Sequence, residues 1–157
     1  MKFPMKTYRA SQIADWILCN IDREAGDSIT HLKLQKLLYY IQAWALVFSG
    51  RPLFEEPIQA WAHGPVVEAI FHKYKDYGWE AIGAPEEVPD IDDLAEQHIK
   101  SILAAYGDYT AKNLELMTHR ETPWIAARGS LPPEARSSAQ ISHESMIEYY
   151  KEILEAE

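Results

Sequence analysis

The chain has 157 residues, of which 47% are hydrophobic and 25% charged, a composition typical of a folded domain and unlike that of a disordered chain. Its single cysteine, Cys19, excludes an internal disulfide and a cysteine-based zinc site, so we expect a reducing compartment, the cytoplasm. The formal net charge of −9 repels phosphate backbones and makes nucleic acid an unfavourable partner.

The first half of the chain is dominated by helical periodicity, with apolar residues recurring at spacings of three and four. This half is predicted to contain a helix over 11–25, a longer helix capped by Thr30 that runs to Ser49 and ends at Gly50, an extended segment over 51–62 that is half of a small hairpin, and a helix from Pro65 to Asp76. The second of these helices is apolar almost all round after Lys36, which is typical of a central buried helix.

The second half is also mainly helical. Its predicted elements are a helix opened by Asp90 with Asp93 and running to Tyr106, a short helix over 110–117, a turn or two from Thr122–Pro123 through Ala127, and a terminal helix capped by Ser142 with Met146, Tyr149, Tyr150, Ile153 and Leu154 facing inward. The sum is an all-α fold of six or seven helices with at most one short β-hairpin.

Signatures of catalysis are missing from the sequence. The spacing of the seven glycines excludes both G-x-G-x-x-G and a Walker A loop, and the six histidines are never closer than nine residues apart. A metal-dependent hydrolase built on His63, Glu68 and His72 stays open as an alternative, although lone histidines usually have structural roles or are exposed. The longest uncharged run in the first half, 37–50, has 14 residues, fewer than the roughly 20 needed to span a membrane. We therefore expect no transmembrane segment, and the basic start lacks the apolar region of a secretory signal.

Negative charge is concentrated in one segment. Residues 76–99 contain no lysine or arginine and eight acids: Asp76, Glu80, Glu86, Glu87, Asp90, Asp92, Asp93 and Glu96. Such a run is usually a solvated loop and helix start. The alternative is a surface that meets a basic partner.

Three segments carry a more specific signal. They are T30-HLKLQKLLYY-40, A60-WAHGPVV-67 followed by Phe71 and Tyr74, and Y106-G followed by Leu114 and L116-MTHRETPW-124. In this order and spacing they resemble the Panacea domain of SocA-like antitoxins, a family whose members are also labelled GepA-like or phage-associated proteins. The resemblance covers residues 7–153, and we expect one domain over 1–157.

The resemblance implies a mainly helical cytoplasmic protein of a bacterium or prophage. It further implies the antitoxin half of a toxin–antitoxin pair, which neutralises a cognate protein toxin, encoded next to it, by direct binding. Within the family, a proteolytic adaptor that delivers its toxin to a AAA+ protease is the alternative mechanism. The resemblance implies no enzymatic activity, cofactor or membrane partner, and the oligomeric state stays open.

Each segment has a structural and a functional interpretation. Helical spacing places Tyr39 in the core, whereas Gln35 and Lys36 either extend their polar ends to the surface or organise a buried polar network. Gly64–Pro65 fits a tight turn into a helix, and Trp61 either packs against that turn or is an exposed aromatic anchor. Thr118 with Glu121 fits a capping box. The candidate partner-binding or motif residues are Gln35, Lys36, Tyr39, Tyr40, Trp61, Gly64, Pro65, His119 and Trp124.

Overall fold

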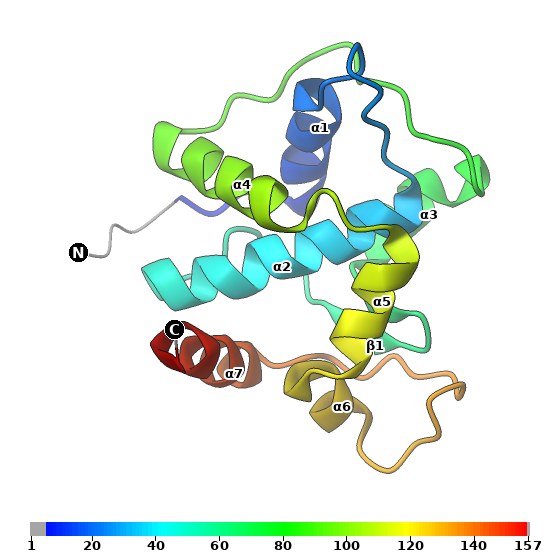
Figure 1. Ribbon diagram of the computed structural model, residues 1–157, viewed down its shortest axis with the longest axis vertical. Helices are drawn as coiled ribbons and strands as arrows, with labels where there is room; N and C mark the ends of the chain where they lie inside the picture. The colour runs from blue at the N-terminus through cyan, green and yellow to red at the C-terminus, as the bar shows by residue number, and fades with distance from the viewer. Residues whose placement is uncertain (1–5, 157) are drawn as a thin grey trace.

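The computed structural model describes residues 6–156 and confirms a mainly helical fold (Figure 1). Within these residues the elements are α1 (Ala10–Asn20), α2 (His31–Ser49), β1 (Gln59–Trp61), β2 (Gly64–Val66), α3 (Glu68–Tyr74), the 3-10 helix η1 (Lys75–Tyr77), α4 (Asp93–Tyr106), α5 (Ala111–His119), α6 (Thr122–Arg128) and α7 (His143–Ala156). None of these helices has the length and hydropathy needed to cross a membrane.

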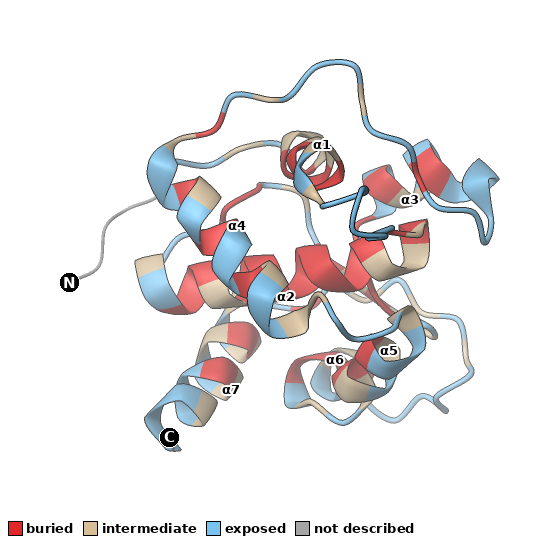
Figure 2. Cartoon of the chain, turned by 45° about the horizontal axis from the view of Figure 1, so that its top comes forward, coloured by how far each residue is buried: buried red, intermediate tan, exposed pale blue. Residues whose placement is uncertain are grey.

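Helix α2 is the centre of the fold. It is in contact with α1 and α4 on one side, α7 on the other, and α3, α5 and β2 near its N-terminal half (Figures 1 and 2). Its residues are apolar on almost every face, so it can be buried only by neighbours all round. As predicted, the Thr30 side chain accepts a hydrogen bond from the Lys33 N–H at 3.2 Å, and Gly50 ends the helix at a φ of 75°.

The predicted helix start at Gly64–Pro65 is wrong, because these residues form strand β2. Pro65 lies opposite Ala60, and Trp61 opposite Gly64, in an antiparallel hairpin. Gly64 has a φ of 105°, which no helix accommodates, and Pro65 lacks an N–H group but is tolerated in an edge strand. Helix α3 begins three residues later, at Glu68. On its other side β1 is hydrogen-bonded to the segment over 139–141.

Other predicted boundaries also differ from those observed. Helix α1 ends at Asn20 instead of continuing to 25, because a series of hydrogen-bonded turns over 21–27 replaces it. Asp92, not Asp90, caps α4 by accepting from the Ala95 N–H at 2.8 Å. Helix α6 includes Thr122, so its N-cap is Glu121. Leu154 points outward and is 40% exposed.

Candidate functional site

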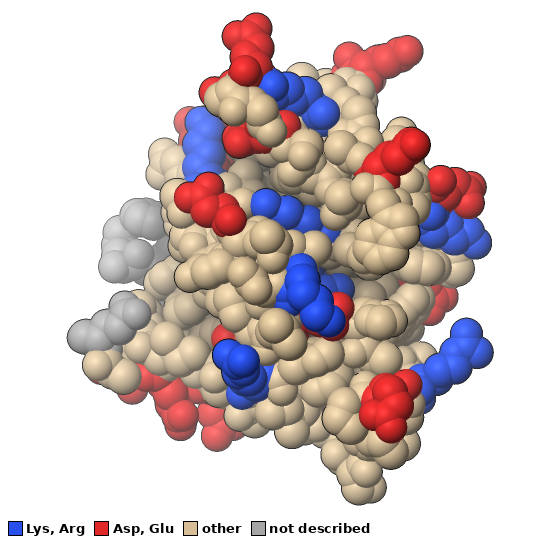
Figure 3. Space-filling view, turned by 45° about the vertical axis from the view of Figure 1, so that its right-hand side comes forward, with Lys and Arg blue, Asp and Glu red and all other residues tan. Residues whose placement is uncertain are grey.

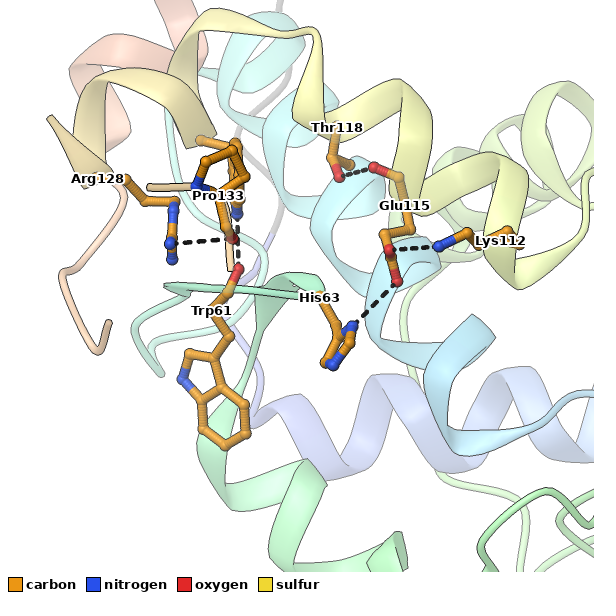
Figure 4. A network of polar contacts seen from close by, with 8 residues as sticks. Trp61, His63, Lys112, Glu115, Thr118, Arg128 and Pro133 are labelled. Atoms are coloured by element: carbon orange, nitrogen blue, oxygen red, sulfur yellow. Dashed lines mark hydrogen bonds and ion pairs between the residues drawn. The ribbon is translucent and has the colours of Figure 1, made fainter. Parts of the chain in front are cut away.

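The three segments singled out in the sequence meet in space. Strand β2, which follows the β1–β2 turn (residues 62–63), contacts both α2 and α5, and α6 contacts β1 (Figures 1 and 4). We call the polar residues gathered here, Lys36, His63, Glu115, Thr118 and His119, the turn cluster. Residues from the three segments therefore form one site, although 19 or more residues separate each segment from the next.

Lys36 is the most unusual member of the turn cluster. Its side chain is only 1% exposed, and its Nζ atom has no hydrogen-bond partner among residues 6–156. Gly64 covers it so closely that a Cβ atom there would lie 2.8 Å from Lys36 Cε. Burial lowers the pKa of Lys36 to about 8, and the charge of Glu115 opposes this shift. The lysine does not extend its amine to the surface, so that interpretation is wrong.

Glu115 is held near the surface of the turn cluster. Its Oε2 lies 3.1 Å from Lys112 Nζ, and its Oε1 lies 3.7 Å from His63 Nδ1 (Figure 4). The Thr118 hydroxyl donates to the Glu115 backbone carbonyl at 2.7 Å, so Thr118 lies inside α5 and forms no capping box with Glu121. This pairing of Glu115 leaves Lys36 without a salt bridge within 4 Å in the described chain.

Two histidine nitrogen atoms of residues 6–156 are buried without a partner in the same way as Lys36 Nζ. His31 Nδ1 and His119 Nε2 are buried and lack a hydrogen-bond partner within the described chain. Burial lowers the pKa of both histidines, and the positive charge of Lys36 lowers it further. Three buried nitrogen atoms, two in the turn cluster and one in the adjacent His31, therefore lack a hydrogen-bond partner in the described chain.

Gln35, by contrast, is fully satisfied. Its Oε1 accepts from the Val67 N–H at 2.8 Å, and its Nε2 donates to the Val67 carbonyl at 3.2 Å. Gln35 thereby fixes the segment that leaves β2 and leads into α3. Its place is inside the fold, at 1% exposure.

The two tryptophans connect the turn to α6. Trp124 is 5% exposed and donates from Nε1 to the Trp61 carbonyl at 2.8 Å. His119 stacks on Trp124 with ring centres 4.0 Å apart, and Arg128 Cζ lies 4.8 Å from the centre of the Trp124 ring. Trp61 is half-buried against Phe71, with ring centres 4.9 Å apart. Trp61 is therefore partly accessible at the edge of the site, whereas Trp124 is part of its support.

A second polar group, next to the turn cluster, joins α2, α6 and α7. Glu121 Oε1 accepts from the Tyr40 hydroxyl at 2.6 Å and lies 2.9 Å from the Tyr150 hydroxyl, which is itself 2.9 Å from that of Tyr39. Burial raises the pKa of Glu121, and the two tyrosine hydrogen bonds oppose the rise. The sequence predicts a capping box for Glu121 and does not predict this role, because hydrophobic periodicity carries no information about the partner of a polar side chain.

Removing Glu121 is expected to weaken this junction. Glu121→Ala leaves the Tyr40 hydroxyl without its acceptor and the Tyr150 hydroxyl with only that of Tyr39, which costs about 2 kcal/mol of unfolding free energy. Glu121→Gln keeps an oxygen at this position and removes a partly desolvated charge, so we expect it to lose less than about 1 kcal/mol. Urea unfolding of the three proteins at neutral pH measures this difference. Equal losses in both variants would contradict the role of Glu121 as an acceptor.

The structure gives no support to a metal site at His63, Glu68 and His72. Across the part of the chain that the structure describes, no three His, Cys, Asp or Glu side chains are placed to hold a metal ion. His72 pairs with Glu68 one helical turn away, at 3.7 Å, while His63 pairs with Glu115.

The acidic segment lies apart from the turn cluster. Its loop passes over α1 at the upper end of the molecule in Figure 1, and acidic side chains stand out at that end in Figure 3. Two of the eight acids have structural partners, since Asp92 caps α4 and Glu96 pairs with Lys100 at 3.2 Å. The other six are exposed, and Trp79 among them is 86% exposed. The acids and the motif residues therefore do not form one continuous contact surface.

Comparison with known proteins identifies the family to which this chain belongs. Residues 34–125 match the family described as "Antitoxin SocA-like, Panacea domain", and the chain belongs to this family. Antitoxin SocA of Caulobacter vibrioides (strain NA1000 / CB15N) is 32% identical over 119 residues, which are 64% of this chain and 61% of the relative. The aligned part thus spans less than two thirds of that relative. No solved structure gives a significant match.

Proposed function

We propose that this protein is the antitoxin of a toxin–antitoxin pair and neutralises a cognate protein toxin by direct, stoichiometric binding in the cytoplasm. The observation that supports it most is the meeting of the three family segments around a turn whose His63 side chain is 81% exposed. The exposed His63 of the second segment and the half-buried His119 of the third lie at this surface, and Lys36 of the first segment is buried beneath them. Binding there would act by covering the active site or substrate channel of the toxin.

Co-expression tests the proposal. The reading frame adjacent to this gene is induced alone and then together with this protein, while growth and toxin level are followed. We expect growth arrest with the reading frame alone and recovery with both. Recovery at an unchanged toxin level supports blocking, whereas recovery with loss of the toxin would indicate delivery to a protease. Arrest that persists in the presence of folded antitoxin would contradict the proposal.

The acidic segment is expected to set the association rate if the toxin is basic. Between about 50 mM and about 0.5 M salt, the association rate constant is expected to fall at least about tenfold, because salt screens long-range attraction between exposed charges. Stopped-flow mixing measures the rate. Replacing Glu80, Glu86 and Glu87 with glutamine is expected to flatten this dependence without changing the fold, since all three are exposed. A rate independent of salt would remove electrostatic steering from the mechanism.

A further inference from the structure

The turn cluster contains a positive charge that the fold itself does not compensate. The nitrogen atoms Lys36 Nζ, His31 Nδ1 and His119 Nε2 are all buried without a hydrogen-bond partner in residues 6–156. A buried ammonium group without an acceptor is strongly unfavourable, and a residue of similar shape without charge would fill the same space. The fold alone therefore gives no reason for lysine at position 36.

The protein has a carboxylate close to Lys36 but holds it elsewhere. Glu115 is the acid whose charge acts on Lys36, yet its two oxygens face Lys112 and His63. The other titratable groups that act on this region are His31 on α2 and Lys112 and His119 on α5, and none of them carries a negative charge. What Lys36 Nζ lacks among residues 6–156 is an anionic acceptor within hydrogen-bond distance.

The cover over Lys36 is the buried Gly64, next to a turn that reaches the surface. Gly64 provides no side chain, and the turn that precedes it has His63 81% exposed at its tip. The same turn borders a cleft of about 620 Å³, whose lining includes Trp61, His63, Glu68 and Arg136. A protein segment that enters the cleft and displaces the turn would reach the amine from this side.

We propose that the protein partner docks over the β1–β2 turn and supplies a carboxylate to Lys36 Nζ. This inference rests on the proposed antitoxin function and identifies the chemistry by which the partner is recognised. A carboxylate matches an ammonium group with unused donors, and such a pair in a water-excluded site is stronger than one at the surface.

Proton uptake on binding is the specific consequence. Free Lys36 has a pKa of about 8 because of burial, and a carboxylate next to it raises that pKa toward the ordinary value. At about pH 8.5, complex formation therefore takes up about 0.7 of a proton at this site, since most of the free amine is neutral and nearly all of the paired amine is charged.

Titration calorimetry of the toxin identified by the co-expression experiment tests this inference. Wild-type protein is titrated at about pH 8.5 in two buffers of different ionisation enthalpy, which gives the proton uptake without any variant. Lys36→Met is expected to abolish the uptake and to weaken binding at least about 30-fold. Lys33→Met is the matched control on the same helix, because Lys33 Nζ already donates to the Gly107 carbonyl.

The outcomes separate the two proposals. Binding without proton uptake, or with uptake that persists in Lys36→Met, would overturn the carboxylate contact while the antitoxin function stands. Absence of binding by folded wild-type protein would overturn both.

Discussion

Lys36→Met is expected to stabilise the free protein by about 3 kcal/mol at neutral pH. The folded-state pKa of Lys36 is about 8 and the unfolded value is 10.5, so the folded state holds the proton less tightly. At pH 7 the amine is charged in both states, and the difference of about 2.5 pKa units corresponds to about 3 kcal/mol of destabilisation. Methionine has a similar shape and no charge, so it removes this cost without leaving a large cavity.

The stability difference between the wild type and Lys36→Met is expected to depend on pH. The stability of the wild type is expected to rise as the pH increases from about 8 to about 10.5, because in that window the unfolded state binds more protons. The advantage of Lys36→Met is therefore full below pH 8 and is lost above about pH 10.5. Urea unfolding of both proteins at several pH values measures the gap. A variant that is less stable than the wild type at pH 7, or a gap that does not change with pH, would contradict the prediction.

Lys33→Met serves as the control for this experiment too. Lys33 lies one helical turn before Lys36, is half-buried, and donates to the Gly107 carbonyl at 2.5 Å. The same substitution there removes a hydrogen bond and is expected to destabilise by about 1 kcal/mol. Stabilisation by the substitution at position 36 and destabilisation at position 33 would show that the hydrogen-bond acceptor of each lysine, and not the residue type, determines the change in stability.

The fold was largely predictable because local signals agree with the tertiary arrangement. Thr30 and Gly50 mark the ends of α2, and the nearly continuous apolar surface between them predicts a helix buried on all sides. For the same reason the predicted six or seven helices agree with the seven α-helices of residues 6–156. Boundaries were missed where a second carboxylate offered an equally good cap, as Asp90 did for α4.

The hairpin shows where local signals fail. Gly followed by Pro is compatible with a turn into a helix and with an edge strand, and the short segment offers no periodicity to decide between them. The strand is selected over the helix by groups outside residues 64–67. These are the pairing with β1 and the two hydrogen bonds between Gln35 and the Val67 backbone. Neither of these can be read from residues 64–67 alone.

The site was predictable in its segments but not in its chemistry. Lys36, Gly64 and His119 were singled out, and all three lie at the turn cluster. Glu115 and Glu121 carry the decisive negative charges but were missed as partners, since partner identity depends on how α5 packs against α2. Glu121 has hydrogen-bond partners and Lys36 Nζ has none in the described chain, and this difference depends on how the helices pack.

Gly64→Ala is expected to destabilise the protein by about 2–4 kcal/mol, through two separable effects. The φ of 105° disfavours any residue with a Cβ atom, at a cost of about 1–2 kcal/mol. The new Cβ would also lie 2.8 Å from Lys36 Cε and 3.2 Å from Thr118 Oγ1, and in a buried site the lysine has little room to move away. Unfolding by urea gives the total loss.

Two comparisons separate the backbone effect from the contact with Lys36. Gly26→Ala is the matched control, because Gly26 has a similar φ of 95° and no atom within 4 Å of its added Cβ, so it undergoes the backbone effect alone. In the Lys36→Ala background the contact with the lysine is absent, and Gly64→Ala is expected to cost at least about 1 kcal/mol less than in the wild type. Additive losses in the double variant would mean that Gly64 and Lys36 are not in contact. The cover of the amine would then need another residue, and the route by which a partner reaches Lys36 would have to lie elsewhere than at the β1–β2 turn.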